Sequence, residues 1–262
     1  MLAFDEDNAR RVEAVYMSPD VVGQRRAIRR ELALQPGEQV LDVGSGPGFL
    51  TSEMALEVGP AGRVHGVDPS ESMLDLARRR ERDATAAPVE LQVADALELP
   101  FPGASLDVVV STQVLEYVDD VPAALEEARR VLRPGGRLLV LDTDWDSIVW
   151  HALDERRMRR VLTAWNEHLA DPYLPRRLPA MLREAGLALK ACTVIALLNR
   201  GRDPDSFSTG LTEMIATYVA GRGGVTRADA LAWAQDVDDM GDDAFFSLNR
   251  YVFVATAPTV RA

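Results

Sequence analysis

The residues best suited to bind a nucleotide stand where short apolar runs of the sequence end. Residues 40–43 are followed at once by the glycine-rich turn 44–48, and the next two apolar runs end in Asp68 and Asp95. Glycine lets the backbone approach a ligand closely because it has no Cβ atom. In doubly wound sheets, a carboxylate in the place of Asp68 accepts hydrogen bonds from ribose hydroxyls. These residue types and spacings predict a nucleotide-cofactor site.

The elements that must position these residues follow from the hydrophobic periodicity. After the turn, apolar residues recur at helical spacing from Leu50 to Val58, so the turn opens onto the N-terminus of a helix. Ser18 is predicted to cap a helix, Thr226 opens another with a capping-box pattern, and Asp120 is predicted to start a third, with Pro122 in its first turn. Four or five β/α units in succession predict a parallel sheet. The strands expected after the first are residues 64–67, 89–93, 106–110 and 137–141.

The glycine turn departs from the dinucleotide fingerprint. The pattern G-x-G-x-x-G would need a third glycine at Phe49, and the turn instead reads G-x-G-x-G after Asp42. With the later motifs VHGVDPS, VADALELPFP, STQVLEYV and VLRPGGRLLVLD, it resembles the class I S-adenosylmethionine-dependent methyltransferases of small-molecule type. Within that family it is similar to the ubiquinone/menaquinone C-methyltransferase-like group, also called the methyltransferase type 11 group. Many relatives carry histidine where Tyr117 stands.

The resemblance implies an α/β fold with a Rossmann-like, seven-stranded methyltransferase sheet. That sheet is parallel with an antiparallel last strand, has helices on both faces, and carries helical cap insertions. The whole chain, 1–262, is expected to be a single methyltransferase domain. Its expected parts are an N-terminal helical segment at 1–35, a cofactor-binding core at 36–145, cap elements at 146–185 and 199–243, and C-terminal strands at 187–198 and 247–256.

The resemblance also implies a cofactor and a reaction. S-adenosyl-L-methionine would donate a methyl group to an oxygen, nitrogen or carbon of a small-molecule acceptor by in-line displacement, leaving S-adenosyl-L-homocysteine. Surface or packing roles remain the alternative for the residues before the core. The expected cofactor-binding residues are Asp42, Gly44, Ser45, Gly46, Asp68, Pro69, Met73, Asp95, Ala96, Thr112 and Gln113, with Tyr16 and Arg25 lining the cleft.

The residues that could act on the acceptor lie beyond the fifth strand. Asp144, His151 and His168 are the catalytic candidates, because a histidine or carboxylate can take a proton from an acceptor. A packed or solvated side chain is the alternative for each histidine. Trp165 and Tyr218 stand at helical spacing and are expected either to form an apolar lid or to belong to the core.

The amino-acid composition indicates which kinds of partner the protein can bind. The net charge of −12 repels polyphosphate backbones and disfavours a nucleic-acid partner. The sequence contains no long apolar run that suggests a membrane span, and its acidic first residues do not resemble a signal peptide, so a cytoplasmic protein is expected. A single cysteine excludes an internal disulfide or a cysteine-based metal cluster, and no metal is expected. A homodimer is left open.

Two other classes of function share some of these features. A nicotinamide-dependent oxidoreductase would use the same glycine turn and Asp68, but Phe49, Asp95 and the two strands at the C-terminal end count against it. A catalytically silent S-adenosylmethionine-binding regulator or partner protein would carry the same cofactor motifs. The sequence alone does not separate this second class from an enzyme.

Overall fold

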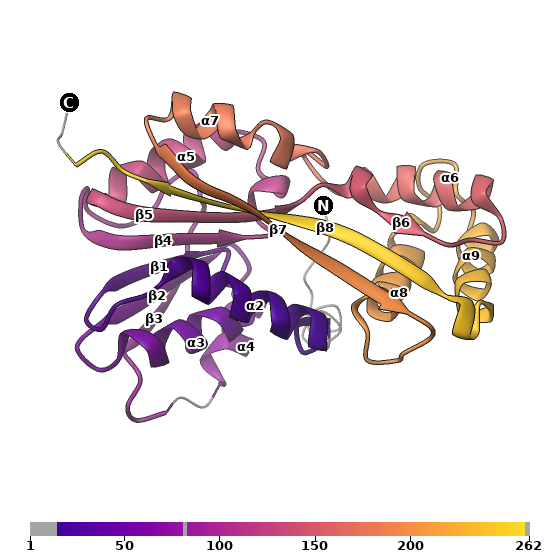
Figure 1. Ribbon diagram of the computed structural model, residues 1–262, viewed down its shortest axis with the longest axis horizontal. Helices are drawn as coiled ribbons and strands as arrows, with labels where there is room; N and C mark the ends of the chain where they lie inside the picture. The colour runs from indigo at the N-terminus through magenta and orange to yellow at the C-terminus, as the bar shows by residue number, and fades with distance from the viewer. Residues whose placement is uncertain (1–14, 81–82, 260–262) are drawn as a thin grey trace.

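The computed structural model describes residues 15–80 and 83–259, so the helical start expected at residues 7–14 lies outside the described residues. One mixed sheet runs through the described part of the chain, in the order β3-β2-β1-β4-β5-β8, with β7 on the far side of β8 (Figure 1). The strands are β1 (Gln39–Val43), β2 (Arg63–Asp68), β3 (Val89–Val93), β4 (Leu106–Thr112), β5 (Leu132–Thr143), β6 (Val149–Trp150), β7 (Ala188–Arg200) and β8 (Phe245–Thr256).

The topology of the sheet confirms the predicted fold. Strands β1 to β5 are parallel, and β8 is antiparallel to both of its long neighbours, β5 and β7. The described residues form eight strands rather than seven, because the two-residue β6 adds a short pairing with β8 beyond the end of β5. The three strands β1, β2 and β3 lie next to one another, so their carboxyl ends meet at one edge.

Helices begin where the sequence places side chains able to cap them. Ser18 accepts a hydrogen bond from Val21 N at 3.4 Å, and Asp120 accepts one from Ala123 N at 3.1 Å. Thr226 forms a reciprocal capping box. The helices are α2 (Pro19–Leu32), α3 (Phe49–Val58), α4 (Glu71–Arg78), α5 (Val121–Val131), α6 (Glu155–Asn166), α7 (Leu178–Glu184), α8 (Phe207–Val219) and α9 (Arg227–Asp239).

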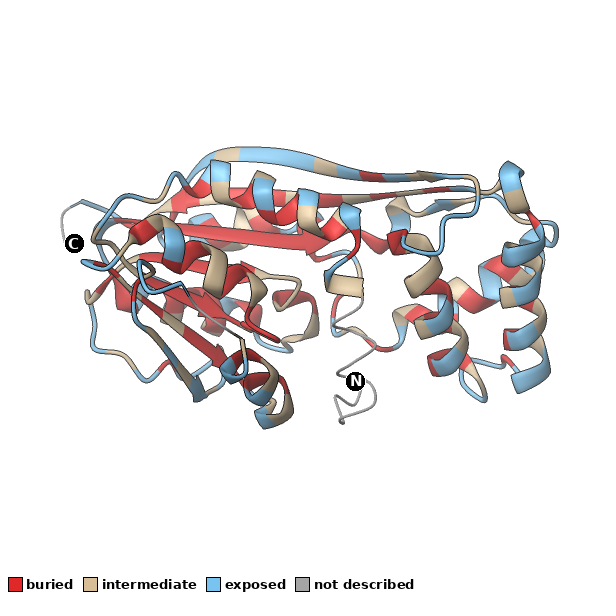
Figure 2. Ribbon diagram, turned by 90° about the horizontal axis from the view of Figure 1, so that it is seen from below, coloured by how far each residue is buried: buried red, intermediate tan, exposed pale blue. Residues whose placement is uncertain are grey.

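Apolar side chains gather on both faces of the sheet and in a separate cap. Helices α5 and α7 cover one face, whereas α2 and α3 cover the other (Figure 1). The long strands β7 and β8 reach beyond β1–β5, and α6, α8 and α9 surround their far ends. The buried residues of these three helices, red in Figure 2, belong to a second apolar cluster. The cap is therefore built on the same sheet as the core.

Among the described residues, no helix combines the length and the apolar character that crossing a bilayer requires. The division of the chain into parts given above stays a prediction.

Replacing Trp233 tests whether the cap has a packed core of its own. Trp233 is 1% exposed and donates to Met158 Sδ at 3.2 Å, so Trp233→Ala leaves a cavity and an unpartnered sulfur. We expect the free energy of unfolding to fall by about 3–5 kcal/mol. Urea unfolding followed by circular dichroism measures it.

The matched control lies on the same helix, α9. Leu231 is 62% exposed, and Leu231→Ala should change the unfolding free energy by less than about 0.5 kcal/mol. Equal losses for the two variants would contradict a packed cap.

Candidate functional site

The glycine turn after β1 is shaped by positive φ angles. Gly44, Gly46 and Gly48 have φ values of 69°, 52° and 76°. A Cβ atom on Gly44 would lie 2.2 Å from Val114 Cγ2, so this position requires glycine for packing. At Gly46 the nearest atom to such a Cβ is Tyr16 Oη at 3.7 Å. The turn therefore leaves space beside Gly46 that a ligand can occupy.

Asp68, at the end of β2, ties this turn to the neighbouring helix. Its carboxylate is buried and accepts hydrogen bonds from Gly46 N at 2.9 Å and Ser70 N at 2.8 Å. Burial raises its pKa, and the two backbone N–H groups partly oppose that rise. Ser70 in turn caps α4. The carboxylate thus fixes the relative position of the turn and α4, whatever else it binds.

Asp42 lies beneath the turn on β1. It is 1% exposed and accepts a hydrogen bond from Thr51 Oγ1 at 2.6 Å. Burial, opposed by the Thr51 hydrogen bond and reinforced by the nearby charge of Asp68, raises its pKa to about 7. Beside it, the buried Ser45 Oγ has no hydrogen-bond partner among the described residues. The floor of the turn therefore offers a hydroxyl and a carboxyl to a ligand.

The remaining predicted cofactor residues on this side lie along the adjacent strand ends. Asp95 follows β3, is exposed, and accepts a hydrogen bond from Leu97 N at 2.9 Å. Ala96 is half-buried, Pro69 is exposed, and Met73 is buried on α4. The structure brings the three carboxylates to the ends of β1, β2 and β3, as the motif order predicts. Their roles toward a cofactor stay predictions.

A cavity of about 140 Å³ leads from the glycine turn toward the cap. Its walls come from the segment before and within α2, the ends of β1, β4 and β5, the cap helices and β8. Aromatic and aliphatic side chains predominate toward the cap. The lining residues are Val15, Tyr16, Val21, Gln24, Arg25, Asp42, Gly44, Ser45, Phe49, Leu50, Thr112, Gln113, Glu116, Tyr117, Trp145, Trp165, Phe207, Leu211, Met214 and Arg250.

Tyr16 and Arg25 line this cavity, as predicted, but each is already engaged. Arg25 donates to the Tyr16 carbonyl at 2.6 Å and to Glu53 Oε1 at 2.9 Å, so its charge is balanced within the chain. The Tyr16 ring stacks on Phe49 with centroids 6.1 Å apart. Burial raises the pKa of Tyr16 to about 12, so its hydroxyl remains a neutral donor above the turn.

Glu116 places a buried carboxyl on the cavity wall. It is 1% exposed, and its Oε2 accepts hydrogen bonds from Thr143 N and Trp145 Nε1, both at 3.2 Å. Burial raises its pKa to about 7, although the backbone hydrogen bond and the charge of Arg250 act in the opposite direction. A carboxyl that titrates near neutral pH can accept a proton from a bound molecule.

Arg250 on β8 supplies a buried cation on the same wall. It is 4% exposed, and its guanidinium donates to Gln24 Oε1 and lies 4.6 Å from the centroid of the Phe207 ring. Its Nε has no partner among the described residues. Burial lowers its pKa to about 10, so the side chain still carries its charge at pH 7.

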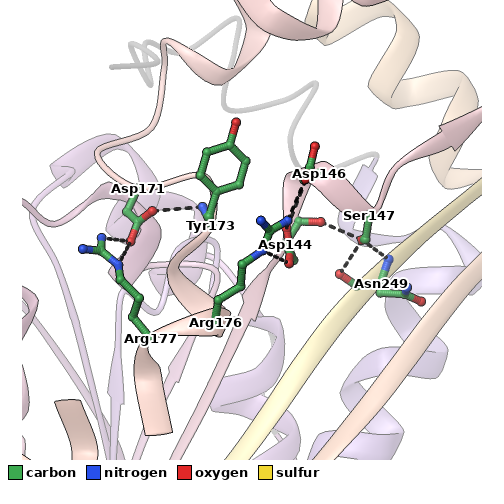
Figure 3. Close-up of polar contacts among 8 residues, drawn as sticks. All are labelled: Asp144, Asp146, Ser147, Asp171, Tyr173, Arg176, Arg177 and Asn249. Atoms are coloured by element: carbon green, nitrogen blue, oxygen red, sulfur yellow. Dashed lines mark hydrogen bonds and ion pairs between the residues drawn. The ribbon is translucent and has the colours of Figure 1, made fainter. Parts of the chain in front are cut away.

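The three catalytic candidates predicted from the sequence do not line this cavity. Asp144 is buried, and both of its carboxylate oxygens accept hydrogen bonds from Arg176, at 2.7 and 2.9 Å (Figure 3). Arg176 also reaches Asp146 at 2.8 Å. The Asp144 carboxylate therefore anchors the segment around Arg176 to the end of β5 and is not free to take a proton.

The histidines are placed differently from each other. His168 is 3% exposed, its Nδ1 contacts the Trp165 carbonyl, and its ring centroid lies 3.8 Å from that of Trp165. Burial lowers the pKa of His168 to about 4, which suits a neutral ring packed behind the cavity wall. His151 is exposed and has Nδ1 3.3 Å from the Asp243 carbonyl, away from the cavity. The alternative stated for the histidines therefore holds: His168 is a packed side chain and His151 a solvated one.

Sequence reasoning missed two of the charged groups that line the cavity, Glu116 and Arg250. For Arg250 a signal existed, because it alternates with Phe246, Leu248 and Val252, all buried on β8. A cation in an otherwise apolar strand face needs a partner. Glu116 lies in the STQVLEYV motif but carries no periodic signal of its own.

Comparisons with known proteins identify the family of this fold. The family model described as Methyltransferase domain matches residues 41–140. A 37.1 kDa protein in transposon TN4556 of Streptomyces fradiae is 36% identical over 232 residues. The match covers 86% of this chain and 64% of the length of that relative. This chain therefore spans less than two thirds of that relative.

A second relative and a solved structure extend the comparison. The demethylmenaquinone methyltransferase of Symbiobacterium thermophilum is 33% identical over 192 residues. The match covers 63% of this chain and 75% of the length of that enzyme. The structure of Haemonchus contortus phosphoethanolamine N-methyltransferase 2 with S-adenosyl-L-methionine superimposes with a TM-score of 0.62 at 23% identity, covering 97% of this chain and 58% of that one.

The fold and the turn define a Rossmann-like protein of the methyltransferase type. The chain belongs to the class I S-adenosylmethionine-dependent methyltransferase family.

Replacing Glu116 tests the raised pKa of its carboxyl. Between the ordinary value and about 7, the folded state keeps a proton that the unfolded state releases, so this group lowers stability as pH rises. Glu116→Gln removes that dependence. Relative to wild type, the variant should gain on the order of 2 kcal/mol of unfolding free energy between pH 5 and pH 8.

Denaturant unfolding at the two pH values measures this gain. Glu126→Gln, at an exposed position on α5, is the control and should follow the wild type. An unchanged pH dependence in Glu116→Gln would show that the carboxyl is not perturbed by burial.

Proposed function

We propose that this protein transfers a methyl group from S-adenosyl-L-methionine to a small-molecule acceptor. The observation that carries the proposal is the continuity of the cavity, which joins Gly44 and Ser45 of the glycine turn to the aromatic side chains of the cap. A donor at the turn and an acceptor in the cap-side chamber would be in contact. When bound, the cofactor supplies an electrophilic methyl group on a positively charged sulfur.

The residues around the turn fit such a cofactor. Space lies beside Gly46, Ser45 Oγ is buried without a partner among the described residues, and the Asp42 carboxyl faces the same cavity. Thr112 and Gln113, at the end of β4, line the wall next to the turn. We assign Asp68 to the ribose, and Asp95 with Ala96 to the adenine, from the order of the motifs.

The chain contributes mainly position and exclusion of water. Holding two reactants in a productive geometry can lower a barrier by roughly 7–11 kcal/mol, whereas a general base typically adds a factor of about 10²–10⁴. The aromatic walls provide the first effect, because they hold a flat acceptor and leave little room for solvent. Glu116 is the cavity group placed to receive a proton, should the acceptor release one.

The names of the relatives support methyl transfer as the reaction, but they do not agree on the acceptor. One is named a demethylmenaquinone methyltransferase, and the structural neighbour is named a phosphoethanolamine N-methyltransferase. These names describe different acceptors, so the acceptor of this chain has to be inferred from its own cavity. The acidic net charge favours a small molecule over nucleic acid.

The direct experiment is calorimetric titration of the protein with S-adenosyl-L-homocysteine, followed by transfer of a labelled methyl group to a panel of acceptors. Saturable binding and transfer are expected. Binding without transfer to any acceptor would favour a regulator, and binding of a nicotinamide cofactor in its place would favour an oxidoreductase.

Asp68→Asn should weaken binding of S-adenosyl-L-homocysteine by about 1–3 kcal/mol, because one amide oxygen replaces two carboxylate oxygens that fix the turn and would meet the ribose. Titration calorimetry gives the affinity. Asp75→Asn, on the exposed face of α4, is the control and should bind as the wild type does. Unchanged affinity in Asp68→Asn would remove this residue from the site.

A further inference from the structure

Arg250 is a feature of the cavity that methyl transfer does not by itself require. Among the described residues its guanidinium donates a hydrogen bond to Gln24 alone, and its Nε has no partner. A buried charge is costly unless it is paired and hydrogen-bonded. Glu116 exerts an electrostatic effect on Arg250, but the two form no ion pair. The cavity wall thus holds a cation whose hydrogen-bonding capacity is largely unused.

The position of Arg250 in the sheet separates it from the cofactor turn. It pairs with Thr143 of β5, and the strand order runs β1-β4-β5-β8. At about 4.8 Å per strand, the backbone of Arg250 lies roughly 14 Å along the sheet from β1, and its guanidinium lies over the Phe207 ring of the cap. Arg25 lies closer to the turn, beside Phe49, and is already paired with Glu53. Arg250 therefore belongs to the acceptor end of the cavity.

The surroundings of Arg250 indicate what kind of molecule it would meet. The guanidinium lies over the Phe207 ring, and the same chamber is lined by Trp145, Trp165, Leu211 and Met214. A chamber with such aromatic and aliphatic walls suits a flat apolar ring with one polar group at the cation.

The charge balance of the chamber favours a single negative charge on that group. Arg250 is opposed by two carboxyls that line the same cavity, Asp42 and Glu116, both with pKa values raised by burial to about 7. A dianion such as a phosphate monoester would face these carboxyls with Arg250 as the balancing cation, because the other arginine of the lining, Arg25, is already paired with Glu53. A carboxylate carries one charge, and its two oxygens match the planar guanidinium.

We propose that Arg250 binds the carboxylate of a flat, monoanionic acceptor whose ring packs among the aromatic side chains of the cap. The proposal rests on the proposed function and names the class of acceptor. Gln24 positions the guanidinium from α2, and Phe207 supports it from α8.

The test compares acids with their uncharged counterparts. Wild-type protein saturated with S-adenosyl-L-homocysteine is titrated with salicylate, 4-hydroxycinnamate and indole-3-acetate, and then with the primary amide of each. Acids that bind should do so about tenfold or more tightly than their amides, since a hydrogen bond to a charged group is lost. In Arg250→Met this preference should disappear while the affinity for S-adenosyl-L-homocysteine stays unchanged. Arg200→Met, at an exposed position on β7, is the control and should keep the preference.

Three results would overturn the proposal. These are equal binding of acids and amides by the wild type, binding of none of the acids at millimolar concentration, and a large loss of S-adenosyl-L-homocysteine affinity in Arg250→Met. The last result would assign the guanidinium to the carboxylate of the cofactor. The wild-type comparison needs no variant, and it holds even if Arg250→Met does not fold.

Failure of the proposed function would look different. If the wild type binds neither S-adenosyl-L-methionine nor S-adenosyl-L-homocysteine, the methyltransferase assignment fails. The acid and amide titrations on the cofactor-free protein then still report on Arg250: a preference for acids supports its role, and equal binding refutes it.

Discussion

The pairing of β8 with its two neighbours determines where the rest of the site lies. Residues 250–256 of β8 pair with β5, and the whole strand pairs with β7, so the segment before Arg250 projects beyond the end of β5. That projecting segment carries the cap. A shift of register by one residue would turn Arg250 to the opposite face of the sheet and put Asn249 or Tyr251 in its place. The cavity thus exists in its present form only in this register.

The buried charges show how much the cavity constrains the surrounding structure. Asp42, Glu116 and Arg250 are each less than 5% exposed, and each would be more stable in water than in an apolar interior. The chain offsets part of this cost with local hydrogen bonds from Thr51, from the Thr143 backbone and to Gln24. Residues of this kind are retained at functional sites more readily than in ordinary cores.

The sequence was sufficient to predict the core because its signals are local. The glycine turn, the N-cap at Ser18, the helix start at Asp120 and the apolar strands all depend on residues close together in the chain, and the structure confirms them. The cap end of the cavity was harder to predict. Glu116 and Arg250 are 134 positions apart in the sequence, and only the pairing of β4, β5 and β8 brings them to one wall. The imidazole of His168 could in principle act as a base. Its ring instead packs against those of Trp145, Trp165 and Tyr218.

Strand β7 has a consequence for how the molecule behaves among copies of itself. In the described part of the chain it pairs with β8 alone, so a row of backbone donors and acceptors faces outward along an exposed strand of 13 residues (Figure 2). Such an edge is a template for adding a strand from another polypeptide. The single lysine of the sequence, Lys190, stands on this edge, and a lysine there opposes intermolecular strand addition because its charge would have to be desolvated. The strand edge open to a second polypeptide therefore belongs to a strand none of whose residues lines the cavity.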